Sequence, residues 1–396
     1  MAARPRVAAL VTEYRKYSHG QNIVDRLIGG YGWETRWHRP ELDVVALYVD
    51  QFPESDLSRE RVERHPDLAM YPTIAEALTL GGEQLAVDGV LIIAEHGNYP
   101  LNEKGQTLYP RYEFFQQTVE VFRNSGRSAP VFLDKHLSWN WDWAREMVAT
   151  SYELDFPFMA GSSVPVCRRV PSVDLSHGAE VEEMVVVGVG GIDSYCIHSL
   201  EGMQSLAERR QGGETGVVSV QGLRGDSAWR ALDDGVWDPA LFEACLCRSL
   251  TLTPADESNR HTYPTREELP QILTNDPVVY CIEYADGMRA TMLLMESLVR
   301  DITVAARVKD RSDPFSLLFY LGAGHHMQPN FFNPLCQHIE NLIINGQTPY
   351  PIERTLLTTG MTASGVESLF QGEKKLATPH LDIHYQVGPE STFRRT

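Results

Sequence analysis

The sequence lacks the cysteine and hydrophobic patterns of several common protein classes. None of its six cysteines forms a CxxC pair, so the sequence predicts neither a structural zinc motif nor a disulfide framework. The apolar run near the amino terminus has only the length of a strand before Glu13 and Arg15 interrupt it. It therefore resembles neither a signal peptide nor a membrane span. We expect a cytoplasmic protein with reduced thiols.

Positive charge is also scarce. The chain has 35 Lys and Arg residues against 53 Asp and Glu residues, which gives a formal net charge of -18. Nucleic acids and anionic membranes are bound by basic surfaces, so we expect neither as a partner. A small-molecule substrate that is neutral or cationic fits this charge better.

The composition is that of a globular protein with two domains. Its 396 residues exceed one ordinary domain, and 43% of them are hydrophobic. Short, β-branched apolar runs at residues 7–11, 44–49, 89–94 and 131–133 alternate with helix-like segments. This alternation is typical of a parallel sheet with helices on both faces. We predict a Rossmann-like, doubly wound α/β domain over residues 1–159.

From about residue 164 the pattern changes to longer strand-like stretches. They lie at residues 183–189, 217–220, 277–284, 289–294 and 314–320. Consecutive strands without intervening helices predict a largely antiparallel sheet. We expect residues 160–396 to form an α+β domain, whose open sheet walls the active site and contributes to a homo-oligomer contact.

The turn after the first predicted strand has few glycines. Dinucleotide-binding turns carry GxGxxG there, because the glycines let backbone amides approach a pyrophosphate. Here the turn reads VTEYRKYSHGQN, with Gly20 alone. His19 in this turn could contact a cofactor or a substrate, or it could face solvent. Asp50 follows the second predicted strand, where an acid would bind ribose hydroxyls, although turn chemistry also favours Asp there.

A charged triplet follows the fourth predicted strand. Asp134, Lys135 and His136 come directly after an apolar run. Burying an unpaired ammonium is costly, so Lys135 needs a function, a partner or access to water.

Four segments in a fixed order give this triplet a context. They are YPTIAEAL (71–78), VDGVLIIAEHGNYP (87–100), VFLDKHLS (131–138) and GGIDSYCIHSLE (190–201). In order and character they resemble the glucose-fructose oxidoreductase and inositol dehydrogenase family, and the resemblance covers residues 6–385. Lys135 matches the lysine of the family's EKP segment, with Asp134 and His136 in place of its neighbours.

The resemblance implies a soluble NAD-dependent oxidoreductase for a sugar, cyclitol or related polyol. It implies that Lys135 lies beside the nicotinamide and the substrate. His198 and Glu201 match the histidine and the last acid of the family's DxGxHxxD motif, while Asp193 stands one residue before the position of its first acid. Lys135 and His198 would then transfer the proton, and Asp193, Glu201 and His136 would contact the substrate.

The segment from Glu95 to Phe115 differs most from the family and starts at the carboxyl end of a predicted strand. Ligands of open α/β sheets bind at such ends, so this segment is predicted to be a pocket loop. We assign Glu95 and Asp134 to the cofactor, together with Asp50 and His19. His96, Tyr99, Tyr109 and Arg111 are assigned to the substrate. Glu95 and His96 could instead be two ligands of a divalent metal, but an adjacent Glu and His alone is weak support, and we predict no metal site.

Further histidines lie near the carboxyl terminus. His325 and His326 are adjacent, and alternation in HLDIHY would put His380, Asp382 and His384 on one face of a strand. Such a face could hold a metal, but exposed polar alternation gives the same pattern, and we favour the latter.

Two other functions remain open. The scaffold could serve a lyase, hydratase or isomerase of an oxidised sugar that needs no NAD. In such an enzyme Lys135, His96 or His198 would remove a proton next to a carbonyl, with or without a metal that polarises the oxygen. It could also be a non-catalytic binding or sensor protein. The glycine-poor turn favours the first of these alternatives. No basic residue follows Asp50 directly, so NAD is preferred over NADP if either binds.

Overall fold

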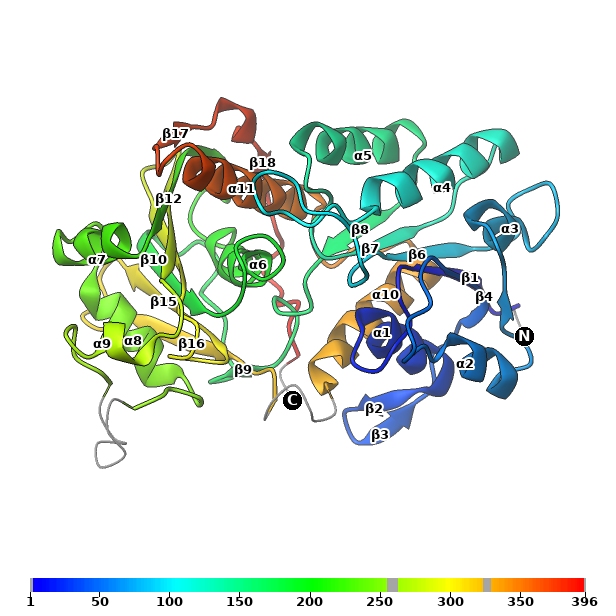
Figure 1. The fold of residues 1–396 in the computed structure, drawn as a ribbon, viewed down its shortest axis with the longest axis horizontal. Helices are drawn as coiled ribbons and strands as arrows, with labels where there is room; N and C mark the ends of the chain where they lie inside the picture. Colours follow the sequence, from blue (N-terminus) through cyan, green and yellow to red (C-terminus); the bar gives the residue numbers. More distant parts are fainter. Residues whose placement is uncertain (1–2, 255–262, 323–328, 395–396) are drawn as a thin grey trace. The chain divides into compact units, whose positions relative to one another are not determined.

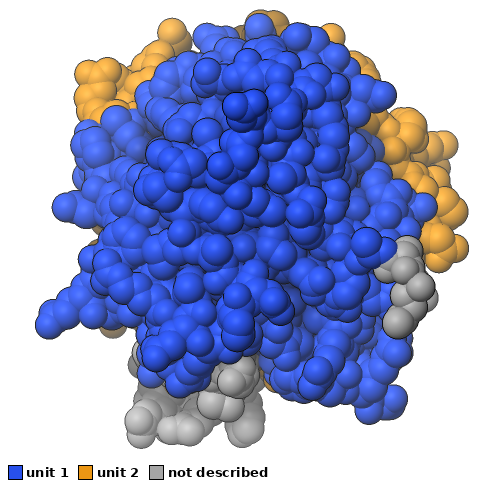
Figure 2. Space-filling model, turned by 90° about the vertical axis from the view of Figure 1, so that its right-hand side faces the viewer, with its two compact units in different colours: residues 1–101, 107–163, 325–356 blue, residues 102–106, 164–324, 357–396 orange. Residues whose placement is uncertain are grey.

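A computed structural model describes residues 3–254, 263–322 and 329–394. The chain divides into two compact units, coloured separately in Figure 2. Unit 1 comprises residues 1–101, 107–163 and 325–356, and unit 2 comprises residues 102–106, 164–324 and 357–396. The sequence suggests a single boundary near residue 160; the observed division differs because the chain returns to unit 1 after residue 324. His325 and His326 lie outside the described residues.

Unit 1 is built on a six-stranded sheet in the order β5-β4-β1-β6-β7-β8 (Figure 1). The strands are β1 (Arg6–Val11), β4 (Asp43–Val49), β5 (Ala69–Met70), β6 (Gly89–Ile93), β7 (Val131–Asp134) and β8 (Phe158–Gly161). All five pairings are parallel. β1 and β6 lie at the centre, where the strand order reverses, as in a doubly wound Rossmann sheet. The predicted fold class of this domain is confirmed.

Helices cover both faces of this sheet (Figure 1). They are α1 (His19–Gly29), α2 (Ser58–Arg64), α3 (Ile74–Thr79), α4 (Arg111–Ser125), α5 (Trp141–Glu153) and α10 (Asn333–Asn345). The side chain of Thr73 caps α3, and Gly126 ends α4 in the left-handed conformation. A hairpin of β2 (Tyr31–Trp33) and β3 (Arg36–His38) follows α1.

The helix α10 explains why residues 325–356 belong to unit 1. It packs on α1 and β7, and a Cβ atom placed on Gly89 of β6 would lie only 2.2 Å from Cδ1 of Ile343. Arg26 of α1 donates a hydrogen bond of 2.8 Å to the side chain of Asn333. The carboxyl-terminal segment therefore completes one face of the amino-terminal sheet.

Unit 2 contains an eight-stranded sheet in the order β17-β12-β13-β14-β10-β15-β16-β9. Its strands are β9 (Arg169–Val170), β10 (Val181–Gly188), β12 (Val217–Arg224), β13 (Val278–Tyr284), β14 (Arg289–Leu294), β15 (Ile302–Val308), β16 (Phe315–Phe319) and β17 (Leu376–Ala377). Only β10 and β14 pair in parallel among these strands, so the predicted, largely antiparallel sheet is confirmed. A short ladder joins β11 (Glu214–Thr215) to β18 (His384–Tyr385).

The prediction that helices are missing between these strands is wrong. Helix α6 (Cys196–Ala207) follows β10, and α7 (Asp226–Asp233), α8 (Pro239–Arg248) and α9 (Leu269–Ile272) lie between β12 and β13. The last long helix is α11 (Glu353–Phe370). These helices are short or have weakly amphipathic sequences, so strand-like stretches dominate the pattern.

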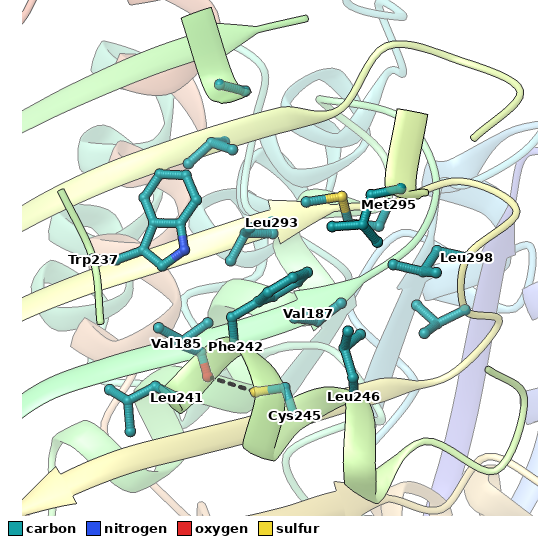
Figure 3. Packing of buried hydrophobic residues seen from close by; sticks show 14 of the residues in the cluster. Val185, Val187, Trp237, Leu241, Phe242, Cys245, Leu246, Leu293, Met295 and Leu298 are labelled. Atoms are coloured by element: carbon teal, nitrogen blue, oxygen red, sulfur yellow. Dashed lines mark hydrogen bonds between the residues drawn. The ribbon is translucent and has the colours of Figure 1, made fainter. Parts of the chain in front are cut away.

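Both faces of the large sheet carry helices. Val185 and Val187 of β10 face a core that includes Leu241 and Phe242 of α8 (Figure 3). On the other face, a Cβ atom on Gly188 would lie 2.2 Å from Oγ of Ser199 on α6. Successive residues of a strand point to opposite faces, which accounts for this division. An oligomer contact on the sheet itself would have to displace one of these layers.

In the described part of the chain, no helix combines the length and the apolar character needed to cross a membrane.

Candidate active site

The candidate site lies at the carboxyl ends of the strands of unit 1. Glu95 and His96 follow β6, and Asp134 is the last residue of β7, directly before Lys135. His19 begins α1, which follows β1. Because β6 lies between β1 and β7 in the sheet, the residues after all three strands converge around the end of β6.

The side chain of Lys135 forms an ion pair with Glu95. Its Nζ atom lies 3.2 Å from Oε1 of Glu95, and Nη2 of Arg111 donates to Oε2 of the same carboxylate. The three side chains are almost fully buried, with 3% of Lys135, 6% of Glu95 and 1% of Arg111 exposed. Buried charges persist only when they are paired, so one carboxylate between two cations accounts for the lysine.

This environment fixes the protonation of the surrounding groups. Burial alone would raise the pKa of Glu95, but the charges of Lys135 and Arg111 hold it well below its usual range. Burial, and then the charge of Arg111, lower the pKa of His136 well below its usual value. Nε2 of His136 lies 3.4 Å from Nη1 of Arg111. The cluster therefore contains an anionic Glu95 and a neutral His136 at neutral pH.

His19 and Asp134 form a second pair in unit 1. Nδ1 of His19 lies 2.6 Å from Oδ2 of Asp134. The histidine side chain is 16% exposed, whereas that of the aspartate is 2% exposed. The centroid of the His19 ring lies 5.3 Å from that of the His96 ring and 5.1 Å from that of the Phe332 ring. Burial, and then the proximity of His19, lower the pKa of His96 to about 4, so His96 is neutral at pH 7.

Two residues of this site have left-handed backbone conformations. The φ angle is +69° at Lys135 and +76° at His96, and neither residue is glycine. Such conformations cost about 1–3 kcal/mol each and cluster at functional sites. The amide of Lys135 donates a hydrogen bond of 3.1 Å to the carbonyl of Gly161, which anchors this turn to β8.

Asp50 lies exposed at the end of β4, where the sequence places a ribose-binding acid. Its carboxylate accepts hydrogen bonds from the hydroxyls of Tyr48, at 3.0 Å, and Tyr99, at 2.6 Å. The ring of Tyr99 packs against Tyr109 at 5.6 Å, and Arg111 lies over the ring of Tyr109 at 5.0 Å. The structure thus links the predicted substrate residues Tyr99 and Tyr109 to Asp50 and to the buried cluster.

The turn from β1 to α1 departs from the dinucleotide-binding pattern. A Cβ atom on Gly20 would lie 2.9 Å from the carbonyl oxygen of Glu13, so this glycine meets the requirement for close packing of helix and strand. Counting back from Gly20, the other two glycine positions of GxGxxG hold Arg15 and Tyr17. Tyr17 adopts the conformation that favours glycine, with φ of +66°. Arg15 pairs with the buried Glu13 at 2.7 Å.

The remaining predicted residues lie in unit 2. His198 and Glu201 are on α6, and the ring of Tyr195 lies 5.9 Å from that of His198. Glu201 is fully buried and accepts a hydrogen bond of 2.8 Å from Thr358. Asp193 is also buried and accepts a hydrogen bond of 3.0 Å from Gln106.

The carboxyl-terminal histidines do not form the strand face that alternation suggested. His380 lies in the 3-10 helix Pro379–Leu381, and only His384 is in a strand, so the three residues share no regular alternation. His384 pairs with Asp382 at 2.7 Å on the surface. Within the described ranges, no group of three or more His, Cys, Asp or Glu side chains could hold a metal ion.

The sequence predicts the residues of the candidate site but not the contacts that these residues make with one another. It named His19 and Asp134 separately as cofactor contacts, whereas the structure pairs them with each other. It predicts that Arg111 contacts the substrate, and in the structure Arg111 is buried and pairs with Glu95. The order of the predicted strands could have suggested the first contact, because it brings the residues after β1 and β7 to the two sides of β6.

Comparisons with known proteins identify the fold. No family model matches the sequence, and no curated protein is similar to it in sequence. Solved structures do match: GenD2 from gentamicin A biosynthesis, in complex with NAD, is 12% identical with a TM-score of 0.57, over 95% of this chain and 97% of that one. The fold is that of the inositol dehydrogenases.

Two further structures support this statement. Myo-inositol dehydrogenase from Lactobacillus casei, in complex with NAD(H) and myo-inositol, is 11% identical with a TM-score of 0.56, over 99% of this chain and 100% of that one. A super-repressor mutant of Gal80p from Saccharomyces cerevisiae is 10% identical with a TM-score of 0.54, over 97% and 100%. The resemblance read from the sequence is thus confirmed as a likeness of fold, which dehydrogenases and a repressor share.

Proposed function

We propose that the protein is an NAD-dependent oxidoreductase that interconverts a secondary hydroxyl and a ketone on a sugar, cyclitol or related polyol. The observation that carries this proposal is the buried cluster of Lys135, Glu95 and Arg111 at the carboxyl edge of a Rossmann-type sheet. A lysine is retained there at the cost of two further buried charges. Packing alone would be served better by apolar side chains.

The residues around the sheet edge fit the adenosine side of NAD and one end of its pyrophosphate. The first turn of α1 reads HGQN and contains no carboxylate, so the helix dipole and the amides not used by the Ser18 cap would favour an anion there. Asp50, held by two tyrosine hydroxyls, would bind the ribose hydroxyls. When bound, NAD would supply the hydride acceptor. Arg15 and Tyr17 replace two glycines, and the pyrophosphate would have to lie differently over this turn.

The protein's own groups would divide the remaining work. The Lys135 ammonium would donate a hydrogen bond to the substrate oxygen and stabilise the negative charge that develops on it. His96 has a buried Nδ1 atom without a hydrogen-bond partner among the described residues, which a substrate hydroxyl would satisfy. His136, Tyr109 and the unit 2 residues Asp193, His198 and Glu201 remain sequence-based candidates for substrate binding and proton transfer.

The experiment that tests this function begins with calorimetric titration of nucleotide-free protein with NAD, NADH, NADP and NADPH. We expect saturable binding of NAD and NADH. NADH formation is then followed with myo-inositol, scyllo-inositol and a panel of sugars, using wild-type protein and Lys135→Met. This variant should keep its NAD affinity and lose kcat by about 100-fold or more. Lys375→Met, which removes an exposed ion pair with Glu283, is the matched control and should retain full activity.

A second function is favoured by one observation, the turn with Arg15 and Tyr17 in place of glycines. A lyase, hydratase or isomerase of an oxidised sugar would use the same buried cluster and would need no pyrophosphate site. Absence of binding to all four nucleotides would contradict the dehydrogenase and leave this alternative. A non-catalytic binding protein would bind a ligand without turnover in either assay.

A further inference from the structure

We propose that His19, oriented by Asp134, is the residue that accepts the proton of the reacting group in this site. The inference rests on the proposed function for its substrate class, but the chemistry that it assigns is shared by the lyase or isomerase alternative. It differs from the sequence-based assignment, in which His19 and Asp134 hold the cofactor and Lys135 and His198 move the proton.

The contact between the two side chains sets the tautomer of the imidazole. An ionised carboxylate can only accept a hydrogen bond, so at 2.6 Å Nδ1 of His19 donates to Oδ2 of Asp134. The second nitrogen, Nε2, then carries the lone pair and can accept a proton. The imidazolium that forms remains beside the Asp134 carboxylate, which stabilises its charge. Asp134 is a positioning residue in this arrangement.

Accessibility also favours His19 over Lys135. The His19 side chain is 16% exposed, and His19 is the first residue of α1, at the carboxyl edge of the sheet. The Lys135 side chain is 3% exposed and is engaged by Glu95. A substrate oxygen approaching from solvent therefore reaches the His19 imidazole more readily than the Lys135 ammonium.

The other groups that face His19 are poor proton acceptors. His96 from the end of β6 lies 5.3 Å away, and its depressed pKa makes it a weak base. Glu95 from the same segment is held ionised by two cations, which makes it weaker still as a base. The apolar ring of Phe332 lies 5.1 Å from the His19 ring, edge to face. Asp134 from β7 contacts Nδ1 of His19 directly, so Asp134, Glu95 and His96 are described neighbours of His19 that would shape the pH dependence.

The reaction balances with His19 in this role. In the oxidation of a secondary alcohol, the O–H proton would pass to Nε2 of His19, and NAD⁺, when bound, would accept the two electrons of the C–H bond as hydride. The products would be a ketone, NADH and an imidazolium, which would return its proton to solvent. In the alternative without NAD, the same nitrogen removes the acidic hydrogen next to a ketone, and no oxidant is required.

Three variants and two assays test the assignment. The variants are His19→Gln, Asp134→Asn and, as a matched control, His384→Gln, which removes an exposed histidine from a His–Asp pair of similar length. The first assay measures NAD affinity, and kcat and KM for polyol oxidation against pH. The second follows deuterium uptake from D₂O next to the carbonyl of inositol-derived ketones, by NMR and without nucleotide.

We expect His19→Gln to lose kcat by about 100-fold or more, while NAD affinity and KM change less than about threefold. The rise of kcat with pH that a histidine base produces should disappear. Asp134→Asn should lower kcat by a smaller factor at unchanged KM, and Asp134→Glu should restore part of it. His384→Gln should match the wild type in every measurement.

The outcomes separate this proposal from the proposed function. Deuterium uptake that requires His19, without any NAD-dependent oxidation, would support the base and contradict the dehydrogenase. Oxidation by His19→Gln at the wild-type rate would overturn the base and leave the dehydrogenase standing. Loss of NAD affinity in His19→Gln at unchanged kcat would return His19 to the cofactor site. A wild-type protein active in neither assay would overturn the base as well.

Discussion

At the scale of single residues, the site is defined by buried charges that stabilise one another. Glu95 is the shared partner of Lys135 and Arg111, and all three lie beneath the surface. Desolvation makes each charge unfavourable alone, so removal of the central carboxylate leaves two cations facing each other in an apolar environment. The stability of unit 1 should depend strongly on this one side chain.

We predict that Glu95→Gln lowers the free energy of unfolding by about 3–5 kcal/mol, the cost of breaking a buried ion pair by removing one partner. Urea unfolding of the full chain at pH 7 measures the effect. The control is Glu367→Gln, which removes the partner of Lys104 from a pair with 31% and 30% exposure and should cost less than about 1 kcal/mol. Equal losses in both variants would mean that the buried cluster contributes no more than a surface pair.

The difference in the free energy of unfolding between the wild type and Glu95→Gln should also depend on pH. The pKa of Glu95 is lower in the folded protein than in the unfolded chain, where it is about 4.3. The unfolded state therefore binds the proton first as the pH falls. The stabilisation by Glu95 is complete above the unfolded pKa and declines as the pH falls below it. The gap between wild type and Glu95→Gln should accordingly be constant from pH 6 to 7 and shrink below pH 4.

At the scale of elements, close packing of a helix on a sheet limits the size of the side chain that fits at certain positions. Gly365 of α11 lies against Tyr280 of β13, and a Cβ atom at Gly365 would lie 2.3 Å from Cε2 of that ring. Tyr280 has little freedom to move, because it is fully buried and its hydroxyl donates a hydrogen bond of 3.1 Å to the carbonyl of Ile192. Helix α11 can approach β13 this closely only because residue 365 has no side chain.

We predict that Gly365→Ala destabilises the protein by about 1–3 kcal/mol through overpacking, although alanine is the better helix former. Thermal unfolding measures the change. Gly29→Ala in α1 is the matched control, since no atom outside its own helix and neighbours lies within 4 Å of the new Cβ. That variant should be neutral or more stable by up to about 1 kcal/mol. A stabilised Gly365→Ala would show that α11 can shift away from the sheet.

The elements also show how far sequence reasoning reaches. The strands β1, β4, β6 and β7 were predicted within one residue at each end, because buried parallel strands are apolar, β-branched runs bounded by turns. Helices α7 and α8, the strand β15 and the hairpin β2–β3 were missed. Their signals are short, and their formation depends on distant segments that no local window contains: the large sheet for α7, α8 and β15, and α10 for the hairpin.

The same limit applies to the candidate site. A lysine at the end of a buried strand signals a partner or a function, and the family-like order of segments located it correctly at a sheet edge. Which carboxylate it contacts depends on the neighbours of β7 in the sheet, and this information lies in the strand order rather than near Lys135. The pairing of His19 with Asp134 likewise depends on the strand order, which brings the residues after β1 and β7 to the two sides of β6.

At the scale of the whole molecule, the chain crosses between its two units more than once. Unit 1 is not complete at residue 163, because α10 covers one face of its sheet. Ile343 fills the space above Gly89, and Asn333 holds the side chain of Arg26 through a hydrogen bond of 2.8 Å. Without α10, an apolar strip along β6, β7 and α1 would face water.

We therefore predict that a fragment of residues 1–163 keeps helical structure but loses fixed packing, with weak near-ultraviolet circular dichroism and strong binding of a hydrophobic dye. Adding a peptide of residues 329–356 should restore the near-ultraviolet signal and displace the dye, because the peptide supplies the missing face. A scrambled peptide of the same composition should do neither. If the fragment instead unfolds cooperatively without the peptide, the folding boundary lies near residue 160, where the sequence alone suggests it. The sheet of unit 1 would then fold without α10.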